Sequence, residues 1–272
     1  MALDRLPSGD SRRRKVISKQ SVLKGLRTKV VGKKLFVFES IDSTNACAKT
    51  LAETGTPEGT VIVADFQTSG RGRLGRTWKS EPGANLLFSL VLRPPLKKEA
   101  AGILTFFSAV FIARALESIA GIPFECKWPN DVLLNGKKCC GILLENSFFQ
   151  DTFAYSVVGI GINVNQASFE KDLAGKATSL FKELGHTFDR TSLLQELLRQ
   201  ADKLMPSLER GNIPEIMDQW NARCSMFGKP VVVAHGNEQI AGTALRLNGD
   251  GGLVVETASG QSTFYAGDVT VV

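Results

Sequence analysis

Residues 70–78 read GRGRLGRTW, and this stretch decides between two classes of fold. GRGRLG has the spacing of a dinucleotide-binding loop, which joins a strand to a helix so that pyrophosphate rests at the helix N-terminus. The strand is present, because residues 59–67 (GTVIVADFQ) form an apolar run. The helix is not, because residues 76–86 contain Pro82 and Gly83 and show no helical period. We therefore reject a Rossmann loop, and the absence of GK[ST] rejects a Walker loop.

The same stretch carries three arginines, Arg71, Arg73 and Arg76. Glycines let a backbone approach a ligand closely. Arginines bind carboxylate or phosphate in bidentate fashion and keep their charge. We interpret the segment as a flexible loop that closes over an anion. A solvated basic turn is the alternative.

Composition indicates a globular protein with one large domain, or a large and a small one. The chain has 272 residues, 43% hydrophobic and 22% charged. Its net charge is +6, and much of the excess lies in residues 1–34, which include RRRK at 12–15. We interpret these residues as a basic N-terminal tail, with a nucleic-acid-binding arm as the alternative. Neither a secretory signal nor a membrane-spanning run is visible, so we expect a cytoplasmic protein without membrane contact.

The chemistry available to the chain is limited by its few histidines. It has two histidines and five cysteines, without a CxxC pair or zinc-ligand spacing. We therefore expect no metal held by protein ligands alone. Lysine, arginine, asparagine and carboxylates must carry any catalysis.

Hydrophobic periodicity predicts an α+β fold. Strands are expected at 33–40, 59–67, 83–95 and 153–165, with a hairpin over 132–145 that turns at Asn135–Gly136. Helices are expected at 42–55, 97–121, 191–211 and 213–224. Short strands between glycine-rich turns fill residues 226–272 and predict a small β-barrel.

A second informative stretch is WPND at 128–131, which leads into the hairpin. Asn130 can donate and accept hydrogen bonds together, which suits an adenine edge or an amide. Asp131 can orient a lysine or hold Mg²⁺ through water. Lys138 lies just past the turn. A core-plus-turn interpretation leaves this polar run unexplained.

Five motifs in this order resemble the biotin–protein ligases, from about Leu35 to the C-terminus. They are DSTN (42–45), GRGRLGRTW (70–78), KWPND (127–131), KKCCGIL (137–143) and GIGINVN (159–165). The resemblance implies a class II synthetase-like mixed or antiparallel sheet packed with helices, plus a C-terminal SH3-like β-barrel. It divides the chain into a lead-in (1–34), a catalytic domain (35–225) and the barrel (226–272).

The resemblance also implies a two-step ligation. Biotin and ATP, with Mg²⁺, would form biotinyl-AMP and pyrophosphate, and biotin would then pass to a lysine of a biotin carboxyl carrier domain. The carrier would belong to acetyl-CoA carboxylase or a related carboxylase. Dimers and monomers both occur in the family, so a homodimer stays open.

Site residues follow from the resemblance by motif position. The catalytic residues would be Lys138, Arg73 and Asp131. Biotin would contact Ser43, Thr44, Asn45, Gln67, Arg71, Gly72, Arg73, Lys138, Gly141 and Gly159, with Gly161 also permitting close approach. The adenylate would contact Arg71, Arg73, Arg76, Trp78, Asn130 and Asn163.

The N-terminus departs from the family's repressors. Only about 34 residues precede the first predicted strand, fewer than a winged helix-turn-helix needs. We therefore expect a monofunctional ligase without sequence-specific DNA binding. A lipoate or octanoate ligase or transferase of the same fold is the main rival. A non-enzymatic nucleic-acid-binding protein is a remote one.

Overall fold

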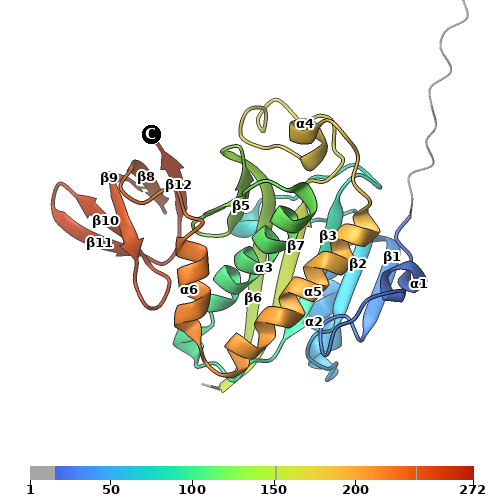
Figure 1. Cartoon of the computed structure of the whole chain (residues 1–272). Helices are drawn as coiled ribbons and strands as arrows, with labels where there is room; N and C mark the ends of the chain where they lie inside the picture. The colour runs from blue at the N-terminus through green and yellow to red at the C-terminus, as the bar shows by residue number, and fades with distance from the viewer. Residues whose placement is uncertain (1–15, 151, 237) are drawn as a thin grey trace, which may run out of the picture.

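The fold is built around two β-sheets, seen in the computed structural model (Figure 1). The structure describes residues 16–150, 152–236 and 238–272. The RRRK run at 12–15 lies outside these residues.

The larger sheet is mixed, as the sequence predicts. Its strand order is β1-β2-β3-β7-β6-β5-β4. Only β1 and β2 are parallel, and each other neighbouring pair is antiparallel. The third strand is buried along its whole length, which explains its continuous apolar run. The strands are β1 (Leu35–Ile41), β2 (Val61–Gln67), β3 (Leu86–Leu92), β4 (Glu125–Lys127), β5 (Asp131–Leu134), β6 (Lys137–Phe149) and β7 (Thr152–Ile162).

Helices cover both faces of this sheet. Alternation along β2 separates the two faces, because Val61 and Val63 join the core under α3 and α5 while Ile62 joins the smaller core under α2. Ser43 caps α2, and its side chain accepts a hydrogen bond from the Ala46 amide. The predicted helices are α2 (Thr44–Glu53), α3 (Ile103–Ala120), α5 (Arg190–Glu209) and α6 (Ile213–Asn221), while α1 (Lys19–Leu23), α4 (Leu180–Leu184) and the short 3₁₀ turns η1 (Arg73–Gly75) and η2 (Lys98–Ala100) are additional.

The central helix α3 is apolar on nearly all sides. By length and composition, the stretch Lys98–Ala120 could cross a membrane, contrary to our expectation that no run is long enough. Within the structure, 67% of an 18-residue apolar window of this stretch is buried, and α3 packs against α5, α6 and the sheet. Its hydrophobicity is accounted for by its place in the core.

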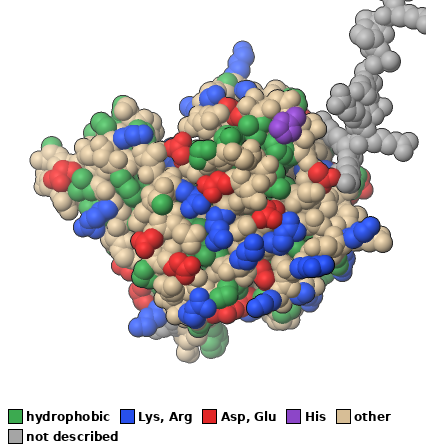
Figure 2. All heavy atoms as spheres, in the orientation of Figure 1, with side chains coloured by type: hydrophobic (Ala, Val, Ile, Leu, Met, Phe, Trp, Pro, Cys, Tyr) green, Lys and Arg blue, Asp and Glu red, His purple; other side chains and the backbone are tan. Residues whose placement is uncertain are grey.

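Residues 16–34 are ordered and packed, although we expected this segment to be a basic tail. Ile17, Val22 and Val31 are buried in the main core. The Asp202 carboxylate of α5 accepts hydrogen bonds from the backbone amides of three successive residues, 29 to 31, at 2.7–2.9 Å. These contacts hold the segment against α5, whose side of the molecule carries interspersed basic and acidic side chains (Figure 2).

The C-terminal residues form a five-stranded antiparallel sheet with order β11-β10-β9-β8-β12. We predicted a small SH3-like β-barrel, and the antiparallel strands are present, but no pairing joins β11 to β12 among residues 238–272, so the described strands do not form a closed barrel. The last strand pairs with β8 instead, so β11 and β12 end at opposite edges. The strands are β8 (Pro230–His235), β9 (Glu238–Leu247), β10 (Leu253–Thr257), β11 (Gly260–Phe264) and β12 (Asp268–Val271).

The small sheet is joined to the large one through buried aromatic residues. The Trp128 indole donates a hydrogen bond to the Gly251 carbonyl oxygen at 3.1 Å. Phe106 of α3 packs edge-on against Trp220 of α6, with ring centroids 5.2 Å apart. These contacts bring the start of β12 to the mouth of a cavity in the larger sheet.

Candidate functional site

One cavity of about 430 Å³ gathers every residue that the sequence placed in the site. It lies over the large sheet, between the glycine–arginine loop, the β5–β6 hairpin and the start of β12. The predicted residues that line it are Ser43, Thr44, Asn45, Gln67, Arg71, Gly72, Arg73, Arg76, Trp78, Asn130, Asp131, Lys138, Gly141, Gly159, Gly161 and Asn163.

The glycine–arginine loop (residues 70–78) is folded back on itself. The Gly72 amide donates to the Arg76 carbonyl at 2.7 Å, and the Trp78 amide donates to the Gly70 carbonyl at 3.0 Å. A Cβ at Gly70 would lie 2.5 Å from the Trp78 carbonyl oxygen. This glycine is therefore required by the close approach of two backbone segments.

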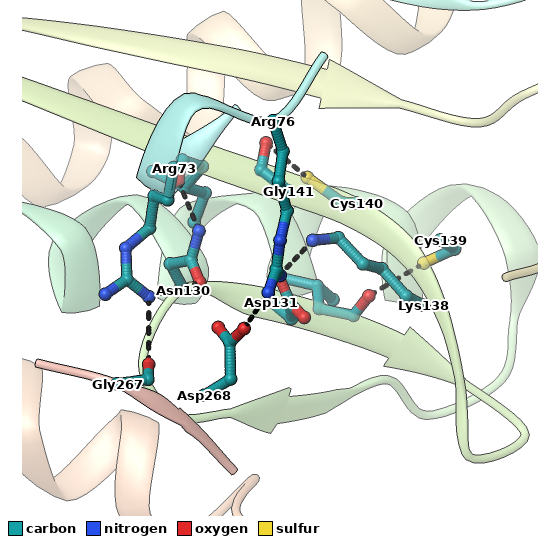
Figure 3. A network of polar contacts seen from close by, with 12 residues as sticks. Arg73, Arg76, Asn130, Asp131, Lys138, Cys139, Cys140, Gly141, Gly267 and Asp268 are labelled. Carbon is teal, nitrogen blue, oxygen red and sulfur yellow. Dashed lines mark hydrogen bonds and ion pairs between the residues drawn. The ribbon is translucent and has the colours of Figure 1, made fainter. Parts of the chain in front are cut away.

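Two arginines of the loop contact oxygens from distant parts of the chain (Figure 3). Arg73 donates to Asn130 Oδ1 at 3.1 Å and to the Gly267 carbonyl at 3.5 Å. Arg76 pairs with Asp268 at the start of β12. Burial lowers the pKa of Arg73, while Asp268 and Asp131 oppose that shift. The site therefore holds fixed positive charge beside carboxylates of the protein.

Lys138 and Asp131 form an ion pair across the hairpin. Lys138 Nζ lies 2.6 Å from Asp131 Oδ1, and the two side chains are 35% and 19% exposed. The turn that brings them together is the predicted one, with positive φ at Asn135 and Gly136. The sequence indicated that Asp131 can orient a lysine, and in the structure that lysine is Lys138.

The Trp78 ring packs against two glycines of the large sheet. A Cβ at Gly161 would lie 2.5 Å from its Cε2 atom, and one at Gly141 would lie 2.8 Å from its Cζ3 atom. The Lys138 ammonium is 5.8 Å from the centroid of the indole ring. The buried indole Nε1 has no hydrogen-bond partner within the described residues. The ring forms a wall of the cavity, on the side that we predicted for a nucleotide.

The opposite end of the cavity has a polar floor. The Thr44 amide and hydroxyl both donate to Gln67 Oε1, at 2.7 and 3.0 Å. Asn45 and Thr44 are buried and contact the buried hydroxyl of Ser89. Polar groups that are this deeply buried have to be paired with one another or with a ligand.

The two asparagines predicted to contact the nucleotide also bond within the protein. Asn130 Nδ2 donates to the Ile142 carbonyl at 2.6 Å, and its Oδ1 accepts from Arg73. Asn163 Nδ2 donates to the Thr178 carbonyl at 3.0 Å. Their contacts with adenine or ribose stay a prediction.

Several cavity residues were not found by the sequence reasoning. Glu145, which borders the cavity through Arg71 and Asn45 but does not line it, pairs with Arg71 at 3.7 Å and had no motif of its own. Residues from β12 and from the segment after β7 are far from the glycine–arginine loop in sequence, and only the tertiary fold brings them near it. The cavity residues without a predicted role are Thr77, Lys79, Lys127, Trp128, Pro129, Ile142, Leu143, Ile160, Phe169, Leu173, Lys176, Ala177, Asp268, Val269 and Thr270.

The donor set does not fit a metal held by the protein alone. The described residues contain no group of three His, Cys, Asp or Glu side chains that could hold an ion. The two carboxylates that line the cavity, Asp131 and Asp268, are each paired with a cation.

Fold and cavity define an α+β protein with a cation-lined cavity beneath a glycine–arginine loop. Residues 37–163 match the Biotin/lipoate A/B protein ligase family, and residues 226–272 match the Biotin protein ligase C terminal domain. The chain is 36% identical to the bifunctional ligase/repressor BirA of Bacillus subtilis (strain 168), over 93% of this chain and 78% of that protein. It is 34% identical to the biotin–[acetyl-CoA-carboxylase] ligase of Paracoccus denitrificans, over 84% and 96%.

A solved structure agrees with these relatives. The biotin protein ligase from Aquifex aeolicus in complex with biotin and ATP is similar, with a TM-score of 0.76 and 32% identity, over 88% of this chain and all of that one. The chain belongs to the biotin protein ligase family.

Replacing Gly161 should disturb the nucleotide side of the cavity. In Gly161→Ala, the added methyl group displaces the Trp78 indole from the sheet. We expect altered tryptophan fluorescence and at least about fivefold weaker ATP binding by calorimetry, because overpacking costs about 1–3 kcal/mol. Gly102→Ala is the control, since nothing lies within 4 Å of its added Cβ. Unchanged fluorescence and ATP affinity would contradict this view of Trp78.

Proposed function

We propose that the chain activates biotin with ATP and transfers it to a lysine of a biotin carboxyl carrier domain. The observation that carries the proposal is a single cavity with a polar floor at one end and fixed cations near the other. The Aquifex aeolicus ligase, which was solved with biotin and ATP, supports both substrates. The acceptor follows from the names of the Paracoccus denitrificans and Mycobacterium tuberculosis relatives, which are biotin–[acetyl-CoA-carboxylase] ligases.

The first half-reaction joins two anions. A carboxylate oxygen of biotin attacks the α-phosphorus of ATP, and the bond from that phosphorus to the bridging oxygen of pyrophosphate breaks. Lys138, Arg73 and Arg76 are positioned to offset the charge that gathers at this phosphate. Preorganised positive groups do this without reorganising at the moment of reaction.

Asp131 has a part in this step through Lys138. It holds the ammonium at 2.6 Å, which fixes the direction in which Lys138 reaches into the cavity. Lys138 must then contact the phosphate without losing its charge.

The second half-reaction makes an amide. The neutral acceptor lysine attacks the acyl carbon of biotinyl-AMP, AMP leaves with the electron pair of the mixed anhydride, and the new amide nitrogen loses a proton to solvent. Until the carrier domain arrives, water has to be kept from the anhydride. The glycine–arginine loop lies over the cavity and can serve this purpose.

The polar floor favours biotin over lipoate. Thr44, Asn45 and Gln67 present paired polar atoms that a ureido ring can match and a dithiolane ring cannot. A site built to hydrogen-bond its substrate rejects an analogue that lacks those groups. The lipoate or octanoate alternative would need an apolar end to the cavity.

Three further points belong to the proposal. Mg²⁺ arrives on the ATP phosphates, since the cavity carboxylates are engaged by Lys138 and Arg76. A homodimer stays open. Binding to DNA should be weak, sensitive to salt and independent of sequence, since residues 16–34 have six Lys or Arg and no Asp or Glu.

Mass spectrometry of an acceptor tests the function directly. A biotin carboxyl carrier domain incubated with the chain, biotin and MgATP should gain one biotin on one lysine. Lipoate in place of biotin should give neither labelling nor ATP–pyrophosphate exchange. Equal exchange with both acids, or an unlabelled carrier, would refute the proposal.

Lys138 should matter for adenylation more than for ATP binding. Lys138→Ala removes one charge-stabilising contact and should lower the rate of biotin-dependent ATP–pyrophosphate exchange by about 10²–10³. The neighbouring Lys137→Ala is a matched control, because Lys137 pairs with Glu183 and is not among the cavity residues. If the Lys138 variant catalyses ATP–pyrophosphate exchange at the wild-type rate, Lys138 has only a structural role in the hairpin.

Arg73 should retain the intermediate. Arg73→Gly breaks the contacts to Asn130 and Gly267, so the loop opens and biotinyl-AMP escapes. We expect serum albumin incubated with the variant, biotin and ATP to become biotinylated on a blot. The exposed Arg210→Gly variant should leave albumin unlabelled. If the Arg73 variant leaves albumin unlabelled and labels the carrier normally, Arg73 does not retain biotinyl-AMP in the site.

A further inference from the structure

Glu145 contacts both the floor of the cavity and the glycine–arginine loop. It lies on β6 opposite Val157 of β7. Its Oε2 accepts a hydrogen bond from Asn45 Nδ2 at 2.6 Å. Its Oε1 lies 3.7 Å from Arg71 Nη1. Neither its motif position nor the mechanism above gives it a role.

The contact with Asn45 begins a chain of hydrogen bonds through the floor. Asn45 is 4% exposed, and its Oδ1 lies 2.6 Å from the Ser89 hydroxyl. That hydroxyl lies 2.8 Å from Thr44 Oγ1. The Thr44 amide donates to Gln67 Oε1. The chain therefore runs from Glu145, through buried groups, to Gln67.

The order of donors and acceptors along this chain depends on the group at its start. A carboxylate only accepts hydrogen bonds, so the Asn45 amide has to turn its Nδ2 toward Glu145 and its Oδ1 toward Ser89. Ser89 has a single proton, which it directs toward Asn45 Oδ1 and Thr44 Oγ1. The Thr44 hydroxyl donates its own proton to Gln67 Oε1, and together with the Thr44 amide it keeps Gln67 Oε1 turned inward.

The shape of Asn45 alone does not fix this order. An asparagine amide rotated by half a turn occupies nearly the same volume, and only its hydrogen bonds select the orientation. Gly159 packs against the amide, with a Cβ there 2.8 Å from Asn45 Cγ, but this is a packing contact without a hydrogen bond, so it does not distinguish oxygen from nitrogen. Of the two groups that contact the ends of the amide, the Ser89 hydroxyl can donate or accept, whereas the Glu145 carboxylate cannot donate.

We propose that Glu145 is a positioning residue that fixes the Asn45 amide and, through it, the donor and acceptor pattern presented to the ureido group. This step rests on the proposed function, because a ureido group has one accepting oxygen and two donating N–H groups. If the order of donors and acceptors along these hydrogen bonds were reversed, donors of the protein would face the donating N–H groups of the ureido ring. Glu145 thereby sets specificity without touching the substrate.

Glu145→Gln tests the proposal with little change of shape. A glutamine can donate or accept, so both orientations of Asn45 become available. The change also removes the ion pair to Arg71, and Arg71→Gln is therefore the comparison that breaks the pair and keeps the carboxylate on Asn45. Glu39→Gln, at an exposed position of β1, controls for loss of charge.

The first measurement needs no ligand. The side-chain amide signals of Asn45 are followed by NMR in deuterated protein. We expect Glu145→Gln to shift these signals and speed their exchange with solvent, and the other two variants to leave them near their wild-type positions. Asn45 signals unchanged in Glu145→Gln would overturn the proposal whether or not the chain proves to be a biotin ligase.

The second measurement uses ATP–pyrophosphate exchange. Glu145→Gln should raise the KM for biotin about 5- to 30-fold, as expected for loss of one or two well-paired hydrogen bonds, with the KM for ATP nearly unchanged. Preference for biotin over its imino analogue, in which an N–H group replaces the ureido oxygen, should shrink in this variant and persist in Arg71→Gln. An equal loss of preference in both variants, or a biotin KM that does not move, would refute the proposal. Absence of exchange in the wild type would instead count against the proposed function.

Discussion

The contacts of Arg73 join three parts of the chain that are remote in sequence. One guanidinium, partly buried, reaches Asn130 on the WPND run and the Gly267 carbonyl before β12. A buried cation without such partners would cost several kcal/mol, so the loop, the hairpin and the small sheet have to come together around it. Arg76 adds a second contact between the loop and the small sheet, an ion pair with Asp268. The small sheet is therefore a wall of the cavity and not a separate appendage.

The wall of the cavity that Trp78 forms depends on glycines beneath the ring. The Trp78 ring can lie on the sheet only because Gly141 and Gly161 lack side chains where β6 and β7 pass beneath it. At the other end, Gly159 leaves room for the Asn45 amide. Three glycines on two adjacent strands thus set the two ends of the cavity. Each is placed by the pairing register of the sheet, because Gly141 lies opposite Gly161.

Much of this could be predicted from the sequence, because the motifs are local. The predicted site residues lie at the start of α2, in the glycine–arginine loop and along or beside strands whose apolar pattern and glycines are readable, and they line one cavity. Asp268 and Lys176 could not be found this way, because they reach the cavity only through the packing of distant segments. Whether the small barrel closes could not be predicted, because short strands and turns do not reveal which edges pair. The order of residues 16–34 was hidden because six of these nineteen residues are Lys or Arg, while the Asp202 carboxylate that binds their backbone lies on α5.

The N-terminus is not the only part of the chain with a surplus of positive charge. Of the described residues that line the cavity, seven are Lys or Arg and only two are Asp or Glu, a surplus of five. The electrostatic field of these side chains is strong inside the cavity, because the protein walls screen charge less than water does. Binding of a triphosphate and a carboxylate in one place becomes favourable on electrostatic grounds. Asp131 and Asp268 keep Lys138 and Arg76 from repelling their neighbours and disordering the loop before those anions arrive.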